Sequence, residues 1–190
     1  MFFGICVAFM YAIKAMATCY GTSLFDENRL LENLQCLTLL AAGGIFLVKS
    51  CICRRYSTVM ALCSSLAFFA ACREMDNVLD KALPIISWRI GFVFVIIAII
   101  HTIRNARDFL PALHDFVATP AFFAMCNVMI IVVPIAQLIG HKPFLQAALP
   151  PGQAIGNIKE LFEECAESIG YLLLLFASIE TLIGLHETKK

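Results

Sequence analysis

Six long apolar runs follow one another along the 190-residue chain, and only short polar connections separate them. A helix needs about 20 residues to cross the hydrocarbon core of a membrane, and each run is close to that length. Hydrophobic residues make up 61% of the chain and charged residues 15%, against about 45–50% and 25% in soluble domains. The sequence therefore predicts an all-α fold, a polytopic bundle of six transmembrane helices.

These helices leave no room for a separate soluble domain, so residues 1–190 are expected to form one integral-membrane domain. The expected helices span about residues 2–20, 29–49, 57–75, 86–104, 116–139 and 157–185. The first run lacks the basic start of a secretory signal and is kept as a helix. Pro120 and Pro134 would kink the fifth helix, and Asn127 would bond to a neighbouring helix. The small residues Ala41–Gly44 would allow close helix packing.

Lysine and arginine gather in alternate connections between the runs. One side of a six-crossing arrangement receives Lys49, Arg54, Arg55, Arg104, Arg107, Lys189 and Lys190, and the other receives Asp26, Glu27 and the Asp76–Lys81 connection. Basic residues remain on the cytoplasmic side of a membrane. We therefore expect both termini to lie in the cytoplasm. The membrane is expected to be the inner membrane of a bacterium.

The densest group of charges beside an apolar run is Cys72–Asn77, which closes the run from Val59 to Ala71. Ionisable residues at membrane depth are costly, so they usually have a partner or a task. The expected topology brings further polar residues to a similar outward depth. The outward set comprises Glu32, Asn33, Arg73, Glu74, Arg89, Glu163, Glu164 and Glu167, with Lys14 slightly deeper. Tyr171 continues the polar stripe of the last helix into the membrane. The inward half has mainly His101 and Glu180, which would bond if their helices were neighbours.

Paired carboxylates suit acid–base chemistry, and an arginine suits a phosphate. We interpret Glu74, Glu167 and Glu32 as candidate catalytic residues. The candidate substrate-binding residues are Arg73, Arg89, Lys14, Asn33, Glu164 and Tyr171. No cofactor is predicted. A divalent cation at the carboxylates is left open, and oxygen ligands would favour Mg²⁺, Ca²⁺ or Mn²⁺. The nine cysteines are scattered, without a CxxC pair or zinc-ligand spacing.

The leading hypothesis is a protein that handles a lipid or small amphipathic substrate at the outer leaflet, with or without catalysis. A small transporter or channel and a non-catalytic membrane subunit or assembly factor remain open alternatives. The polar set could also serve helix packing alone, since carboxylates favour the first turn of a helix. The formal net charge is zero, which disfavours nucleic acid as a partner. Membrane lipids are the expected partners, and a second copy or another membrane protein stays open.

Overall fold

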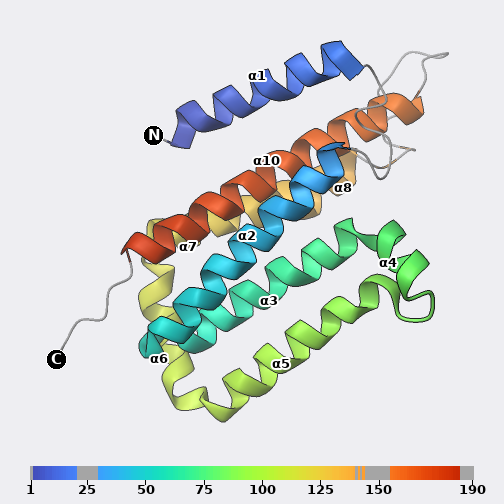
Figure 1. The fold of residues 1–190 in the computed structure, drawn as a ribbon. Coiled ribbons are helices and arrows are strands. Elements are labelled where there is room, and N and C mark those ends of the chain that lie inside the picture. Colours follow the sequence, from blue (N-terminus) through green and yellow to red (C-terminus); the bar gives the residue numbers. More distant parts are fainter. Residues whose placement is uncertain (1, 21–29, 140, 142, 144–154, 185–190) are drawn as a thin grey trace.

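The computed structural model describes residues 2–20, 30–139, 141, 143 and 155–184 (Figure 1). Within these ranges the chain is almost wholly helical and contains no strand, so the all-α prediction is confirmed. The elements in chain order are α1 (Phe2–Tyr20), α2 (Leu30–Ile52), η2 (Arg54–Tyr56), α3 (Ser57–Glu74), α4 (Asp76–Ala82), η3 (Ser87–Ile90), α5 (Gly91–Arg104), α6 (Ala106–Val117), α7 (Pro120–Ile130), η4 (Ile131–Ile135), α8 (Ala136–Ile139) and α10 (Ile155–Gly184).

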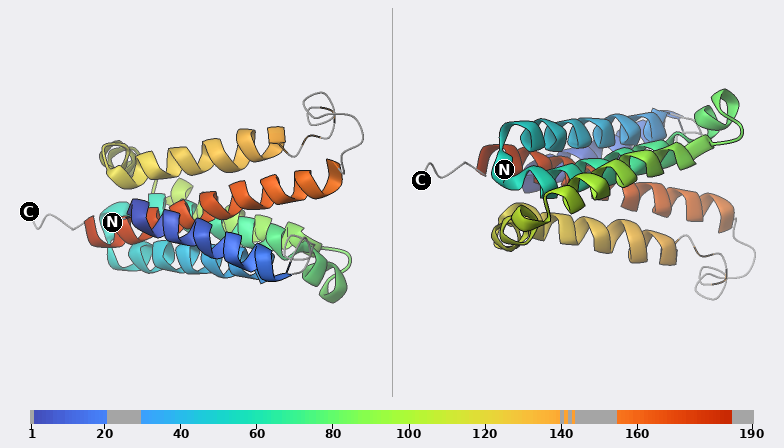
Figure 2. Two further views of the ribbon diagram at one scale, coloured as in Figure 1. Left: turned by 90° about the horizontal axis from the view of Figure 1, so that it is seen from above. Right: turned by 90° about the horizontal axis from the view of Figure 1, so that it is seen from below.

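The long helices run side by side as a bundle (Figures 1 and 2). Helix α2 packs against α3 and α10, α3 also packs against α5, and α10 also packs against α7. We call the two ends of the bundle the α4 end and the α6 end, after the helices that lie there (Figure 1). Helix α1 begins and α10 finishes at the α6 end.

Four stretches are long and apolar enough to cross a membrane: Leu31–Ile52, Arg54–Glu74, Ser87–Arg104 and Leu161–Gly184. Helix α6 and the α7–η4 segment pass the same test together, with a bend of 86° between them. The chain therefore has the helices of an integral membrane protein, and its described residues contain four candidate spans, or five if the bent pair counts as one. The six crossings and the side of the termini stay predictions.

Two connections that were expected to be loops are helical. The segment after Arg104 forms α6, because its apolar residues recur at helical spacing and bury Ala112 and Phe116 against Tyr56 and Val59. The segment after Glu74 forms the short helix α4. The fifth predicted helix accordingly begins later than expected, at Pro120, where the Thr119 hydroxyl accepts a bond from the Phe122 amide.

Pro134 and Asn127 lie in the same part of the chain, and of the two Asn127 differs from expectation. Pro134 lies within a π-helical turn, η4, because a proline has no N–H to continue the regular helical ladder. Asn127 was expected to bond across helices. Its amide instead donates to the Phe123 carbonyl one turn back on its own exposed helix face.

The small residues of α2 do allow close packing, as predicted. A Cβ on Gly43 would lie 2.9 Å from the Phe68 ring of α3. The Ser64 hydroxyl donates to the Gly43 carbonyl at 2.8 Å. Helices α2 and α3 are therefore closely packed where the Gly43 backbone contacts the Ser64 and Phe68 side chains.

Candidate functional site

The last turn of α3 and the first half of α10 bring oppositely charged side chains together at the α4 end. Arg73 Nη2 donates to Glu167 Oε1 at 3.0 Å. The Tyr171 hydroxyl donates to Glu74 Oε1 at 2.6 Å. Glu167 and Tyr171 are four residues apart and therefore share a face of α10, and that face meets two adjacent residues of α3.

Helix α2 joins the same group through Gln35. The Gln35 amide Nε2 lies 2.9 Å from Glu164 Oε2, 2.9 Å from Ser168 Oγ and 3.2 Å from the Glu164 carbonyl oxygen. Gln35 is 2% exposed, and its Oε1 atom is buried without a hydrogen-bond donor among the described residues. We call the set Gln35, Arg73, Glu74, Glu164, Glu167, Ser168 and Tyr171 the polar cluster.

Negative groups outnumber positive ones around the polar cluster. The charged groups that act on Glu74 are Arg73, Glu32 and Asp76. The charged groups that act on Glu167 are Arg73 and the carboxylates Glu74, Glu163 and Glu164. The Glu167 side chain is only 5% exposed, whereas the Arg73 side chain is 46% exposed. The cluster is therefore acidic in total, and Arg73 forms its accessible edge.

The structure brings most of the predicted site residues together. Glu74, Glu167, Glu164, Arg73 and Tyr171 belong to the polar cluster, and Glu32 lies within electrostatic reach of Glu74 and Glu164. Asn33 lies on the exposed side of α2, one residue beyond Glu32.

Lys14 and Arg89 are placed apart from the described contacts of the cluster. Lys14 is exposed on α1, because the neighbouring Ile13 is the residue that α1 buries against Leu31. Arg89 is exposed in η3, where Trp88 packs its ring against Phe69 and Phe92. Their predicted role in substrate binding is therefore not supported by their positions.

Two members of the cluster, Gln35 and Ser168, are absent from the sequence-based prediction. Both are neutral and lie inside apolar helices, where a lone polar residue is also compatible with packing. Their signal is spacing, because Gln35 follows Glu32 by three residues and Ser168 follows Glu164 by four.

The cluster does not have the form of a metal site. In the part of the chain that the structure describes, no group of three or more His, Cys, Asp or Glu side chains is arranged to hold a metal ion. The carboxylates of the cluster instead accept bonds from arginine, tyrosine and glutamine. The eight cysteines described all carry free thiols.

An apolar groove of about 260 Å³ adjoins the polar cluster. Its walls are α3 and the α7–η4 segment, and α2 and α10 form its floor. Its lining residues are Leu39, Cys63, Leu66, Ala67, Phe69, Ala70, Arg73, Met125, Val128, Met129, Val132, Val133, Tyr171 and Leu174. Leu66, Met129 and Val133 line the groove and are exposed, so the groove opens at the side of the bundle.

Ser57, His101 and Asn105 lie together at the α6 end but are not arranged for nucleophilic catalysis. His101 Nε2 lies 3.2 Å from the Ser57 hydroxyl. The Asn105 amide donates to the His101 carbonyl and faces its Nδ1 at 3.5 Å. An N–H aimed at Nδ1 favours the proton on Nε2, whereas a serine nucleophile needs that nitrogen as a base. Glu180, the expected partner of His101, instead lines a hollow between α7 and α10.

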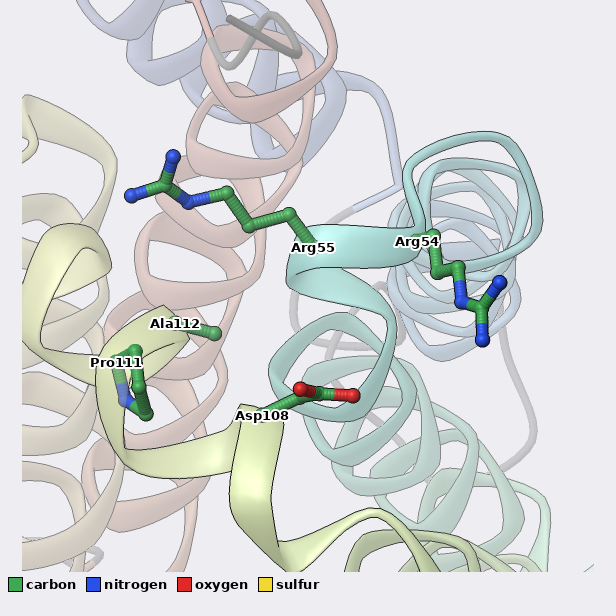
Figure 3. Close-up of a pocket in the computed structure, with 5 residues that line it drawn as sticks. All are labelled: Arg54, Arg55, Asp108, Pro111 and Ala112. Carbon is green, nitrogen blue, oxygen red and sulfur yellow. The ribbon is translucent and has the colours of Figure 1, made fainter. Parts of the chain in front are cut away.

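A second hollow, of about 310 Å³, lies between η2 and α6 at the α6 end (Figure 3). Arg54 and Arg55 extend from η2 in different directions, and Asp108 of α6 lies below both in the view of Figure 3. Arg55 forms an ion pair with Asp115. The two guanidinium groups therefore do not converge on one ligand.

Comparison with known proteins gives no relative: no protein-family model, curated protein or solved structure matches the chain. Function is therefore inferred from the polar cluster and the groove beside it.

Proposed function

We propose that the protein binds a single-chain amphipathic molecule of the membrane, with the chain in the groove and the headgroup at the polar cluster. One observation carries this proposal: Arg73 and Tyr171 line the groove and also belong to the polar cluster. A molecule whose chain enters the groove therefore presents its polar end to the cluster.

The size of the groove favours one chain over two. Its volume of about 260 Å³ lies just below the range of about 300–1,000 Å³ for pockets that enclose drug-sized ligands. The sideways opening at Leu66 and Val133 lets a chain enter from the lipid without crossing water. A diacyl lipid would have to leave its second chain outside.

The headgroup has to supply most of the selectivity. A chain that moves from lipid into the groove exchanges one apolar environment for another, so the hydrophobic effect contributes little. Hydrogen bonds and charges at the cluster act in a medium of low dielectric constant, where they are stronger than in water.

The proposed orientation places the cluster at the outer leaflet. Lys49, Arg54, Arg55 and Arg104 lie in elements that meet at the α6 end, where α1 begins and α10 finishes. The excess of basic residues there supports a cytoplasmic position for that end. With α1 as a further crossing and α7 to α8 as another, the chain crosses six times, with both termini in the cytoplasm. A bacterial inner membrane fits this proposal.

The single tryptophan gives a direct test. The Trp88 ring contacts the Phe69 ring at a centroid distance of 6.1 Å, and Phe69 lines the groove. In phosphatidylcholine nanodiscs, a fatty alcohol with bromine atoms at mid-chain should quench Trp88 fluorescence in a saturable way. A diacyl lipid with brominated chains should quench it only in proportion to its amount.

Two alanine variants provide the matched comparison. Ala70→Phe places a ring in the groove and should abolish the saturable quenching. Ala41→Phe adds the same ring on an exposed face of α2 and should leave it intact. Equal quenching curves for both variants and the wild type would contradict the proposal.

A further inference from the structure

We infer that the headgroup recognised at the polar cluster carries a protonated amine. This inference rests on the proposed function and names the chemical class of the molecule that the groove binds. Its basis is the charges and hydrogen bonds of the cluster.

Arg73 can neutralise only one of three carboxylates, the buried Glu167 and the partly buried Glu74 and Glu164. It donates to Glu167 at 3.0 Å, and the pair as a whole has no net charge. The bonds that the structure gives to Glu74 and Glu164 come from neutral donors, the Tyr171 hydroxyl and the Gln35 amide. In the described part of the chain, the hydrogen bonds to these two carboxylates therefore bring no positive charge.

An ammonium ion complements this arrangement. Buried charges are costly unless they are paired and hydrogen-bonded, and an ammonium brings both a positive charge and three N–H donors. The buried Gln35 Oε1 atom, which lacks a donor among the described residues, is a further acceptor within the cluster. Tyr171 and Phe69 also line the groove, and aromatic rings attract cations.

An anionic headgroup fits the same place poorly. It would approach Arg73, whose guanidinium already donates to Glu167. It would also come close to Glu74 and Glu164, and like charges repel strongly at low dielectric constant. A neutral alcohol would avoid this repulsion but would not pair with a carboxylate.

The test is a competition between molecules that share one chain and differ in their heads. Dodecylamine, dodecanol and dodecanoate are titrated against the brominated fatty alcohol bound to the wild-type protein in phosphatidylcholine nanodiscs, at neutral pH. An amine is protonated there, because its pKa is near that of lysine, about 10.4. We expect dodecylamine to compete at a concentration about tenfold lower than dodecanol, since bonds to charged groups are stronger than neutral ones. We expect n-butylamine, which lacks the chain, not to compete.

The possible results of the competition distinguish the amine inference from the groove proposal. If the three dodecyl compounds compete equally, or dodecanoate competes best, the amine inference is wrong while the groove proposal stands. If none of them displaces the brominated alcohol, both are wrong. Competition by n-butylamine at the same concentration would show that a free amine is the ligand and that the chain plays no part. The wild-type ranking decides these cases without any variant.

Variants then locate the pairing. Glu74→Gln keeps an acceptor for Tyr171 but removes the charge, so the preference for the amine over the alcohol should fall about tenfold. Glu163→Gln is the control for loss of a carboxylate charge near the cluster, because Glu163 lies on α10 and pairs with Lys159 at 3.1 Å. An unchanged preference in Glu74→Gln together with unchanged preference in Glu164→Gln would overturn the assignment.

Discussion

The Tyr171 hydroxyl donates a 2.6 Å hydrogen bond to Glu74 across 97 positions of the chain. Tyr171 is buried in α10, and Glu74 is the last residue of α3. The bond therefore fixes the end of α3 against α10 at the point where the polar cluster meets the groove.

Removing this bond should destabilise the protein. Tyr171→Phe keeps the ring that lines the groove but leaves a partly buried carboxylate oxygen without its donor, a loss of about 1–3 kcal/mol in the free energy of unfolding. The measurement is thermal unfolding in detergent. Tyr11→Phe, which changes an exposed tyrosine of α1, should leave the melting temperature unchanged. A melting temperature for Tyr171→Phe equal to the wild type would show that the bond contributes nothing.

The Arg73–Glu167 pair should show coupling in a double-mutant cycle. Arg73→Met leaves the buried Glu167 carboxylate without its cation and should reduce stability by about 1–3 kcal/mol. Glu167→Gln in the same chain removes the stranded charge and should recover part of that loss. The Lys159–Glu163 pair, a local pair on one helix, should give a coupling energy of only about 0.3–0.5 kcal/mol. Additive single-variant effects at Arg73 and Glu167 would exclude an energetically important pair.

The sequence predicts the long helices well because an apolar run of crossing length has few alternatives. It does not predict α6 or α4, because both segments are short and charged and resemble loops. The apolar spacing of Phe109, Ala112 and Phe116 is present in α6. Its meaning depends on Tyr56 and Val59, which those residues contact only in the folded chain.

The candidate site likewise contains residues that the sequence could predict and residues that it could not. Charged residues such as Glu74 and Glu167 could be predicted from their depth in the membrane. Gln35 could not, since a single neutral residue in an apolar helix does not indicate its partner. The groove could not be predicted either, because Leu66 and Val133 look like lipid-facing residues and line a groove only through the lateral position of α7 and η4.

Neighbouring glycines of α2 should respond differently to the same substitution. Gly43→Ala places a methyl group 2.9 Å from the Phe68 ring and should reduce stability by about 1–3 kcal/mol. Gly44→Ala meets no atom within 4 Å and should be neutral or slightly stabilising, because alanine favours a helix. Thermal unfolding of the two variants in one detergent makes the comparison. Equal melting temperatures for the two variants would mean that the contact between Gly43 and the Phe68 ring does not limit how closely α2 and α3 pack.

Native cysteines test the proposed orientation. Cys19 is exposed in the last turn of α1, and Cys51 is exposed near the end of α2 beside the basic residues of η2. In chains that retain one of these cysteines, a membrane-impermeant maleimide should label Cys19 in intact cells and Cys51 only after lysis. Labelling of both in lysed cells is the control for reactivity. The reverse pattern in intact cells would invert the topology.

Gly170 lies on α10 at the contact between α10 and η4, and both elements line the groove. A Cβ on Gly170 would overlap the Val132 side chain of the π-helical turn η4, and Val132 lines the groove. Gly170→Ala should therefore displace η4 and weaken saturable quenching of Trp88 by the brominated alcohol. Val132→Ala removes the methyl groups that are overlapped, so the double variant should bind more like the wild type. If Val132→Ala fails to restore binding to Gly170→Ala, the wall formed by η4 does not determine the shape of the groove.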